Sequence, residues 1–245
     1  MGLFWPALLG LGTLVAAGVM LSDGGGGSTA PGSYNGAGAT LGNIIDNVGE
    51  KTGTLQSGEP TDDVTPTFTG TGTPGNTVII KDGDNPIGQA TVDKDGKWEF
   101  TPVTPLPEGL HQIIVIEKDP QGHESPPSKV FELSIDLSAP DQPVISDVLD
   151  NVGMIQGSIA HEGMTDDATP TLSGGGQTPG DIVIIKDNGS AIDQVIVDKD
   201  GKWTFTPNLP LNDGKHEFTL IAKDPVGNAS EESDPLYCDR RHHEA

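Results

Sequence analysis

Two long stretches of this chain carry nearly the same sequence. Blocks that begin at Asp46 recur in the same order 104 positions later, and the blocks from Thr73 onward recur 105 positions later. The segment Val92–Trp98 returns letter for letter as Val197–Trp203. The change of offset places one inserted residue near Gly176. Ordered matches at a fixed spacing indicate two copies of one structural unit, each about 100 residues long.

Each copy has the pattern of short β-strands joined by turns. In the second copy, His216, Phe218, Leu220 and Ala222 alternate with their neighbours at the period of two that is typical of a strand. The 34 glycines and 20 prolines, with only 33% hydrophobic residues, favour strands over helices. A unit of this size and pattern predicts an all-β fold of two tandem immunoglobulin-like β-sandwich domains, preceded by an apolar N-terminal helix and a Gly-rich spacer.

The expected domain order follows the composition along the chain. It is an apolar segment at 1–22 that can form a membrane helix, a Gly-rich spacer at 23–43, the first repeat at 44–138, a Pro-containing linker at 139–147, the second repeat at 148–238 and a tail at 239–245.

The apolar run from Leu3 to Leu21 has about the length that spans a bilayer. A secretory signal would carry a basic residue ahead of it, whereas the first basic residue here is Lys51. Two alternatives stay open. Residues 3–21 form a membrane-contacting helix that anchors the N-terminus, or an apolar helix that packs against another domain.

The net charge of the chain limits the classes of partner that it can bind. With 36 acidic and 13 basic residues, the formal net charge is -23, which repels the phosphates of nucleic acids. Ca²⁺ is the partner that such a surface favours, because it binds several oxygen ligands at once. Keeping an extracellular protein soluble is the alternative role of the charge. A lone cysteine, Cys238, excludes a disulfide within one chain.

Several motifs argue for structure rather than catalysis. Trp98 and Trp203 occupy equivalent positions and are expected in the cores. Asp95-Gly96 and its counterpart Asp200-Gly201 predict tight hairpin turns. The glycines from Gly70 to Gly75 fit a dinucleotide-binding pattern, but a strand follows them instead of the helix that this chemistry needs. We therefore expect no enzyme activity.

The repeated blocks resemble the bacterial immunoglobulin-like repeats of Bap-like adhesins, which are giant, biofilm-associated, type I-secreted surface proteins. The resemblance covers residues 44–238 and consists of Asp-Asn-Val-Gly, Thr-Asp-Asp-x-Thr-Pro-Thr, Thr-Pro-Gly, Asp-Lys-Asp-Gly-Lys-Trp and Asp224-Pro225-Val226-Gly227-Asn228. It implies strings of sandwich domains at the cell surface, stiffened by calcium, that promote adhesion and biofilm formation through a surface, host or matrix ligand.

This sequence departs from the family pattern in two respects. The first copy has Gly122-His123 where the second has Gly227-Asn228, so a ligand at that loop is expected to be weaker in the first copy. The chain also stops after two repeats and carries no glycine-aspartate nonapeptide repeats, from which we expect a truncated member of the family.

The candidate calcium ligands are acidic and amide residues in duplicated loops or beside the linker. Carboxylates clustered near a domain end can supply the six to eight oxygens of a calcium site, although Asp and Asn also stabilise turns. The candidates are Asp46, Asn47, Asp62 and Asp63 in the first copy, their counterparts Asp150, Asn151, Asp166 and Asp167, the residues Asp136 and Asp147 that flank the linker, and Asp119 and Asp224 at strand ends.

The function expected from the sequence is that of a non-enzymatic, cell-surface or extracellular adhesin fragment whose calcium-stiffened repeats act as a stalk. The rival interpretation is a carbohydrate-binding or accessory β-sandwich module of a secreted hydrolase. A carbohydrate module would require exposed aromatic residues, and the chain has only three tryptophans and two tyrosines.

Overall fold

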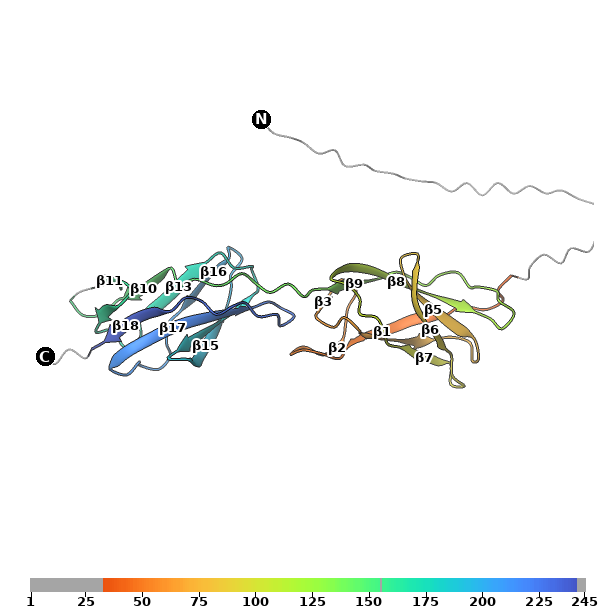
Figure 1. Cartoon of the computed structure of the whole chain (residues 1–245), viewed down its shortest axis with the longest axis horizontal. Coiled ribbons are helices and arrows are strands. Elements are labelled where there is room, and N and C mark those ends of the chain that lie inside the picture. The colour runs from red at the N-terminus through yellow and green to blue at the C-terminus, as the bar shows by residue number, and fades with distance from the viewer. Residues whose placement is uncertain (1–32, 155, 242–245) are drawn as a thin grey trace, which may run out of the picture. The chain divides into compact units, whose positions relative to one another are not determined.

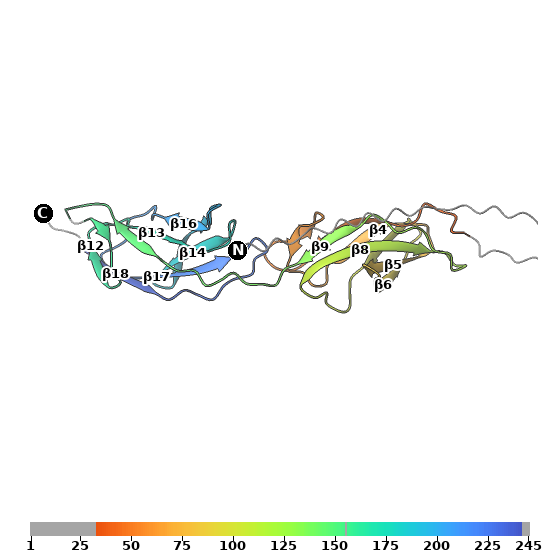
Figure 2. The ribbon, with the colours of Figure 1, turned by 90° about the horizontal axis from the view of Figure 1, so that it is seen from above.

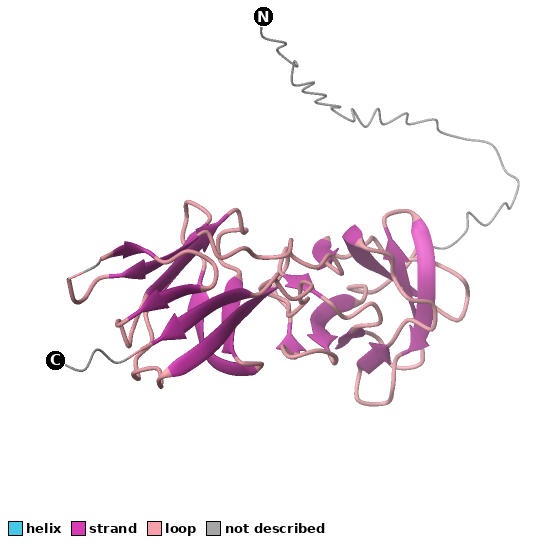
Figure 3. Ribbon diagram, turned by 60° about the vertical axis from the view of Figure 1, so that its left-hand side comes forward, coloured by secondary structure: helices cyan, strands magenta, loops and turns pink. Residues whose placement is uncertain are grey.

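The computed structural model describes residues 33–154 and 156–241. Every regular element in these ranges is a β-strand (Figure 3). This confirms the all-β class, with two immunoglobulin-like units. The expected N-terminal helix lies outside the described residues. Within the described ranges, no helix is long and apolar enough to cross a membrane.

The first repeat forms two sheets (Figure 1). The four-stranded sheet has the order β2-β1-β4-β7 and the five-stranded sheet the order β3-β9-β8-β5-β6. All neighbours are antiparallel except β3 and β9, which run parallel. The strands are β1 (Thr40–Asp46), β2 (Gly53–Thr54), β3 (Pro60–Thr61), β4 (Thr67–Thr71), β5 (Thr77–Asp82), β6 (Asn85–Thr91), β7 (Lys97–Phe100), β8 (Gly109–Lys118) and β9 (Phe131–Ile135).

The second repeat has the same topology (Figure 2). Its sheets have the orders β11-β10-β13-β16 and β12-β18-β17-β14-β15, and β12 runs parallel to β18. The strands are β10 (Asp147–Asp150), β11 (Gly157–Ser158), β12 (Gly163–Thr165), β13 (Thr171–Gly175), β14 (Ile182–Asp187), β15 (Ser190–Ile196), β16 (Lys202–Phe205), β17 (Gly214–Lys223) and β18 (Leu236–Arg240). The first strand of repeat 1 thus begins ahead of residue 44, and β18 continues beyond residue 238.

Each sandwich has a hydrophobic core of its own. The alternation expected for the second copy is that of β17, where His216, Phe218, Leu220 and Ala222 are all buried. In the first sandwich the fully buried side chains include Ile44, Phe68, Val78, Ile80, Ile113, Val115 and Leu133. In the second they include Val148, Leu172, Val183, Ile185, Phe218 and Leu220.

Both repeated tryptophans lie in these cores, as the sequence predicted. Trp98 is 3% exposed and Trp203 is 2% exposed. Each ring crosses a glycine on the neighbouring strand. A Cβ on Gly174 would lie 2.7 Å from the Trp203 ring and 2.3 Å from the carbonyl oxygen of Val144. A glycine at position 174 of β13 is therefore required by the close approach of the indole.

Two duplicated histidines tie a loop to a strand in each sandwich. In the first, His111 Nδ1 lies 2.7 Å from Asp82 Oδ2, and its Nε2 lies 2.8 Å from the carbonyl oxygen of Pro107. In the second, His216 makes the same two contacts with Asp187 Oδ2 and the carbonyl oxygen of Asn212. Both ring nitrogens of each histidine thus face acceptor oxygens, one from a strand end and one from a loop carbonyl.

The Asp-Gly turns are tight, but the hairpins predicted for them are wrong. Asp93 Oδ1 accepts hydrogen bonds from the backbone N–H groups of Asp95 (2.9 Å) and Lys97 (2.8 Å). These bonds, with the one from Lys97 the strongest, lower the pKa of Asp93. The strands that the turn joins pair with different partners, β6 with β5 and β7 with β4. The turn therefore carries the chain from one sheet to the other.

Cys238 lies on β18 and belongs to the second core. It is 2% exposed, and burial raises the pKa of its thiol to about 11, with a smaller contribution from the charge of Asp187. The buried thiol is therefore protonated and unreactive at neutral pH.

The glycine beneath Trp203 gives a first testable prediction. Replacing Gly174 with Ala should lower the free energy of unfolding of the second sandwich by about 1–3 kcal/mol, because the added methyl overlaps the indole and a carbonyl oxygen. Gly175→Ala is the matched control, since its Cβ would make ordinary contacts of 3.4 Å and longer. Urea unfolding followed by tryptophan fluorescence measures both. Equal losses in the two variants would contradict this role for Gly174.

The buried thiol gives a second prediction. The unfolded chain ionises Cys238 near its ordinary pKa of 9.0, whereas the folded chain does so only near pH 11. The free energy of unfolding should therefore fall, relative to that of Cys238→Ala, as the pH rises from 9 to 11. Urea titrations of both proteins at several pH values measure this difference. A constant difference across that pH range would show that the thiol is not desolvated.

Candidate functional site

A network of carboxylates and hydroxyls closes one end of the first sandwich. Asp46 and Asp63 are 5% and 1% exposed. Thr61 Oγ1 donates to Asp46 Oδ2 at 2.5 Å and accepts from the backbone N–H of Asp63 at 3.1 Å. Asp63 in turn accepts from the backbone N–H groups of Asn47 (2.9 Å) and Thr65 (2.8 Å). These bonds fasten the loop that follows β1 to the loop that follows β3.

The second sandwich repeats this network residue for residue. Thr165 Oγ1 donates to Asp150 Oδ2 at 2.6 Å, and Asp167 accepts from the backbone N–H groups of Asn151 (3.2 Å) and Thr169 (2.8 Å). The duplicated acidic residues of the sequence are thus brought together in both copies. Most of their oxygens hold loops in place, as the turn-forming alternative predicted.

Asp62 is the exception in the first copy. Its carboxylate folds over Gly49, which has a positive φ of 71° and no Cβ; a Cβ on that glycine would lie 2.2 Å from Asp62 Oδ2. Asp62 Oδ1 is buried without a hydrogen-bond partner among the described residues. Burial raises the pKa of Asp62, and the charges of Asp46, Asp63 and Asp224 raise it further. The counterpart Asp166 folds over Gly153 in the same way.

Asp224, which repels Asp62, belongs to the second sandwich and shapes the turn after β17. Its Oδ1 accepts from the backbone N–H groups of Val226, Gly227 and Asn228 at 3.0, 2.7 and 2.9 Å. Its Oδ2 accepts from Asn228 Nδ2 at 2.8 Å. These four hydrogen bonds fix the turn. They also fix the position of the Asp224 carboxylate, whose negative charge acts on Asp62.

The equivalent turn of the first sandwich is built on Asp119. Its Oδ1 accepts from the backbone N–H groups of Gln121 and His123, both at 2.9 Å, and its Oδ2 lies 2.8 Å from His123 Nδ1. Burial raises the pKa of Asp119, but these hydrogen bonds outweigh it and the pKa lies below its ordinary value. His123 thus replaces Asn228 as the side chain that partners the carboxylate.

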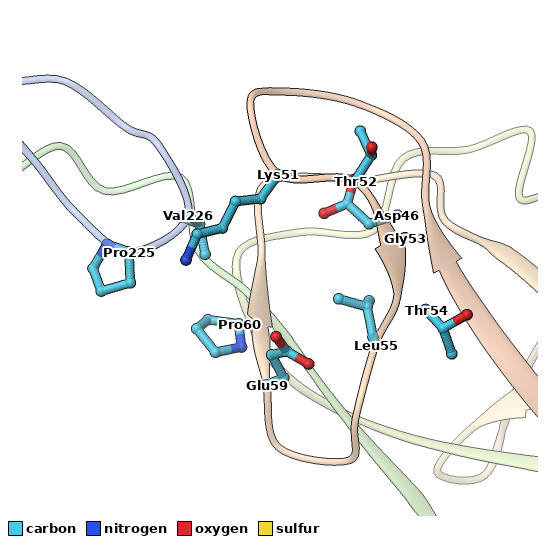
Figure 4. A pocket seen from close by; sticks show the side chains of 10 residues that line it. All are labelled: Asp46, Lys51, Thr52, Gly53, Thr54, Leu55, Glu59, Pro60, Pro225 and Val226. Carbon is cyan, nitrogen blue, oxygen red and sulfur yellow. The ribbon is translucent and has the colours of Figure 1, made fainter.

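The turn at Asp224 contacts the first sandwich. Lys223 Nζ lies 2.6 Å from Glu50 Oε1, and Asn228 Nδ2 donates to the carbonyl oxygen of Asp136 at 3.0 Å. Val226 is 4% exposed, yet it belongs to neither hydrophobic core. Figure 4 shows Pro225 and Val226 on their loop beside Leu55, which directly follows β2, and Pro60 of β3. We call this contact the repeat junction.

Two buried polar residues of the second sandwich were missed in the sequence. Asp181 and Gln177 are 2% and 7% exposed, and Asp181 Oδ2 and Gln177 Oε1 have no hydrogen-bond partner among the described residues. Burial raises the pKa of Asp181, the hydrogen bond from the backbone of Thr178 lowers it, and the charge of Asp224 raises it again, so that it lies above its ordinary value. Asp224 is thus an electrostatic neighbour of both Asp62 and Asp181.

The first sandwich places its buried carboxylate on another strand. Asn76 stands at the position of Asp181, and Glu117 at that of Ala222. Glu117 is fully buried, and its Oε1 accepts from Asn76 Nδ2 and from the backbone N–H of Thr73, both at 2.8 Å. An acidic residue in line with Ile113 and Val115 on the core-facing side of β8 was the signal that could have found it.

Asp136 and Asp147 are the remaining candidates. Asp136 follows β9, where its backbone N–H donates to the carbonyl oxygen of Thr61, and its carboxylate accepts from the backbone N–H of Ser138. Asp147 pairs with Ser173 in the sheet of the second sandwich. Within residues 33–154 and 156–241, no three Asp, Glu, His or Cys side chains converge closely enough to form a ready-made metal site.

Comparisons with known proteins identify the domain family of these two sandwiches. Residues 40–137 and 145–239 each match the bacterial Ig-like domain. No curated protein matches the sequence. Among solved structures, the fibronectin(III)-like modules of Clostridium thermocellum CbhA are similar at 17% identity, over 78% of this chain and 95% of that chain, with a TM-score of 0.43.

Two structures of proteins named for biofilm association or adhesion are similar at 20% identity, each over 84% of this chain. They are the BSP domain of a biofilm-associated protein, with a TM-score of 0.27, and a tetra-tandem repeat from the extending region of a large adhesion protein, with a TM-score of 0.32. The match covers 31% of the former and 50% of the latter. Because the two matched segments make up most of its length, this chain belongs to the bacterial Ig-like domain family.

Proposed function

We propose that this chain is a non-enzymatic stalk segment of a cell-surface adhesin, and that Ca²⁺ binds at its repeat junction. The observation that carries the calcium proposal is Asp62, a carboxylate with a buried, unpartnered oxygen and a pKa raised by burial and by Asp46, Asp63 and Asp224. Because Asp224 belongs to the other sandwich, a cation that offsets this repulsion would act on both repeats at once.

The residues at the junction fit a hard divalent cation. Asp62 Oδ1 is buried there without a hydrogen-bond partner among the described residues. In the second sandwich, Asp181 Oδ2 and Gln177 Oε1 are buried in the same condition, and Asp181 is an electrostatic neighbour of Asp224. Carboxylate and amide oxygens are the ligands that Ca²⁺ prefers, and its variable coordination lets water and backbone carbonyls complete the shell. Asp46, Asp63 and Asp224 would add charge while their oxygens keep the loops in place.

Calcium would act mechanically. The turn from Asp224 to Asn228 contacts the first sandwich through one exposed ion pair, one hydrogen bond and the side chain of Val226. An exposed ion pair stabilises a contact by about 1 kcal/mol or less. A cation bound between carboxylates of both repeats would add its binding free energy to the contact and restrict bending. Stiff repeats extend an adhesive surface away from the cell.

We also propose where the chain acts and what kind of protein it belongs to. Membership of the bacterial Ig-like domain family agrees with a place at the cell surface or outside the cell, in attachment and biofilm formation through a surface, host or matrix ligand. We interpret the chain as part of a Bap-like, type I-secreted adhesin. The carbohydrate-binding alternative gains no support from Trp98 and Trp203, since both lie in the cores and supply no exposed platform.

Asp62 gives the test of the calcium site. In EDTA, Asp62→Asn should raise the melting temperature, because it removes a desolvated charge among like charges. In calcium at about 100 times its dissociation constant, the native chain should gain about 3 kcal/mol and the variant much less. Asp166→Asn is the matched control and should keep the response. If Asp62→Asn responded to calcium as the native chain does, calcium would not bind at Asp62.

The pKa of Asp62 also predicts a pH dependence. Its pKa is raised in the folded state, so the ionised form opposes folding at neutral pH. The contribution of Asp62 to stability should therefore improve as the pH falls through the folded pKa towards the ordinary value of 3.8. In EDTA, the stability advantage of Asp62→Asn over the native chain should shrink on acidification. Denaturant titrations between pH 7 and pH 4 measure it, and an advantage that grows with acid would contradict the assignment.

A further inference from the structure

The far end of the second sandwich carries an exposed apolar surface. Met154, Ile159 and Met164 line a depression of about 590 Å³, with Asp150 and Arg241 among the polar residues around it. The side chain of Met154 is fully exposed, and Met164 is 66% exposed. We call this the end surface. Exposed apolar residues gathered in one place are typical of a contact site.

The internal repeat shows what such a surface contacts. Met154, Ile159 and Met164 occupy the positions of Glu50, Leu55 and Pro60, at the same offset of 104 residues. In the first sandwich, the corresponding surface forms a smaller depression of about 160 Å³, because Pro225 and Val226 of the next repeat line it as well (Figure 4). The first end surface is thus covered by a Pro-Val turn, whereas no such turn among the described residues lines the equivalent surface of the second sandwich.

The end surfaces of the two sandwiches differ in their side chains at two equivalent positions. Glu50 of the first sandwich pairs with Lys223 at 2.6 Å, whereas the second has Met154 at this position. Met164 likewise replaces Pro60 with a longer apolar side chain. A turn that covers the second surface therefore gains from apolar contacts and has no carboxylate at position 154 for a lysine to pair with.

We propose that the end surface of the second sandwich binds the Asp-Pro-aliphatic-Gly turn of a further immunoglobulin-like sandwich placed in series. The occupant is a turn like Asp224–Gly227. The other such turn of this chain, at Asp119, has Gln121 where the second repeat has Val226, and both Pro120 and Gln121 are exposed. The polar side chain of Gln121 would pack poorly against Met154 and Met164. The partner that we infer is therefore a further sandwich and not the Asp119 turn of a second copy of this chain.

This inference rests on the proposed role as one segment of a stalk, but it does not require calcium. The test is therefore done in EDTA, where the calcium site contributes nothing. Failure of the docking would leave the calcium response of Asp62 intact, and failure of the calcium response would leave the docking intact.

The experiment extends the chain with a third sandwich. A copy of residues 136–241 is joined after Arg240, which is the end of β18, with both methionines of the added copy changed to leucine so that only the original pair reports. The second sandwich has a complete core of its own, so its copy is expected to fold. Oxidation of Met154 and Met164 by hydrogen peroxide is then followed by mass spectrometry, because exposed methionines oxidise faster than buried ones.

The extended chain should oxidise at both methionines several-fold more slowly than the two-sandwich chain. Changing Val226 to Asp in the added copy alone should restore the fast rate, which separates docking from mere linkage. Equal rates with and without the third sandwich would overturn the proposal. So would concentration-dependent dimerisation of the two-sandwich chain with protected methionines, because the occupant would then be a second copy.

Discussion

The end of each sandwich depends on a pair of buried carboxylates that hold two loops together. In the first repeat, Asp46 and Asp63 share Thr61 as a common partner and accept hydrogen bonds from the backbone of both loops. Buried carboxylates are tolerated only with such partners, since an unpaired one costs several kcal/mol. Once both loops are fixed, the carboxylate of Asp62 lies over Gly49, and its Oδ1 has no hydrogen-bond partner among the described residues.

Duplication with small changes gives the two sandwiches different roles. The turn of the second repeat carries Val226 and contacts its neighbour, whereas the turn of the first carries Gln121 in the same place. The end surface of the first sandwich offers Glu50 to a lysine, and that of the second offers Met154 to solvent. Identical folds can thus form junctions of different chemistry, because only the residues at the loop tips differ.

Much of this could be predicted from the sequence, because the repeat and the strand period are local patterns. The two sandwiches follow from the repeat, the buried tryptophans from their equivalent positions in it, and the strand around Phe218 from alternation. The pairing of the strands does not follow from local patterns. For this reason the Asp95-Gly96 turn was predicted to close a hairpin, whereas it connects strands of two different sheets. The acidic loops were found because they recur. Asp181 and Gln177 were missed because they do not recur, and their burial depends on packing at a distance in the sequence.

The central claim is that calcium couples the two sandwiches, and it is tested most directly by their relative mobility. Spin labels on Lys94→Cys and Lys199→Cys would sit on exposed turns, one in each sandwich, where both side chains are 86% exposed. The native Cys238 is buried and would not take up label at neutral pH. Pulsed electron paramagnetic resonance should give a broad distance distribution in EDTA and a narrow one in calcium. Distributions of equal width in both would contradict the account.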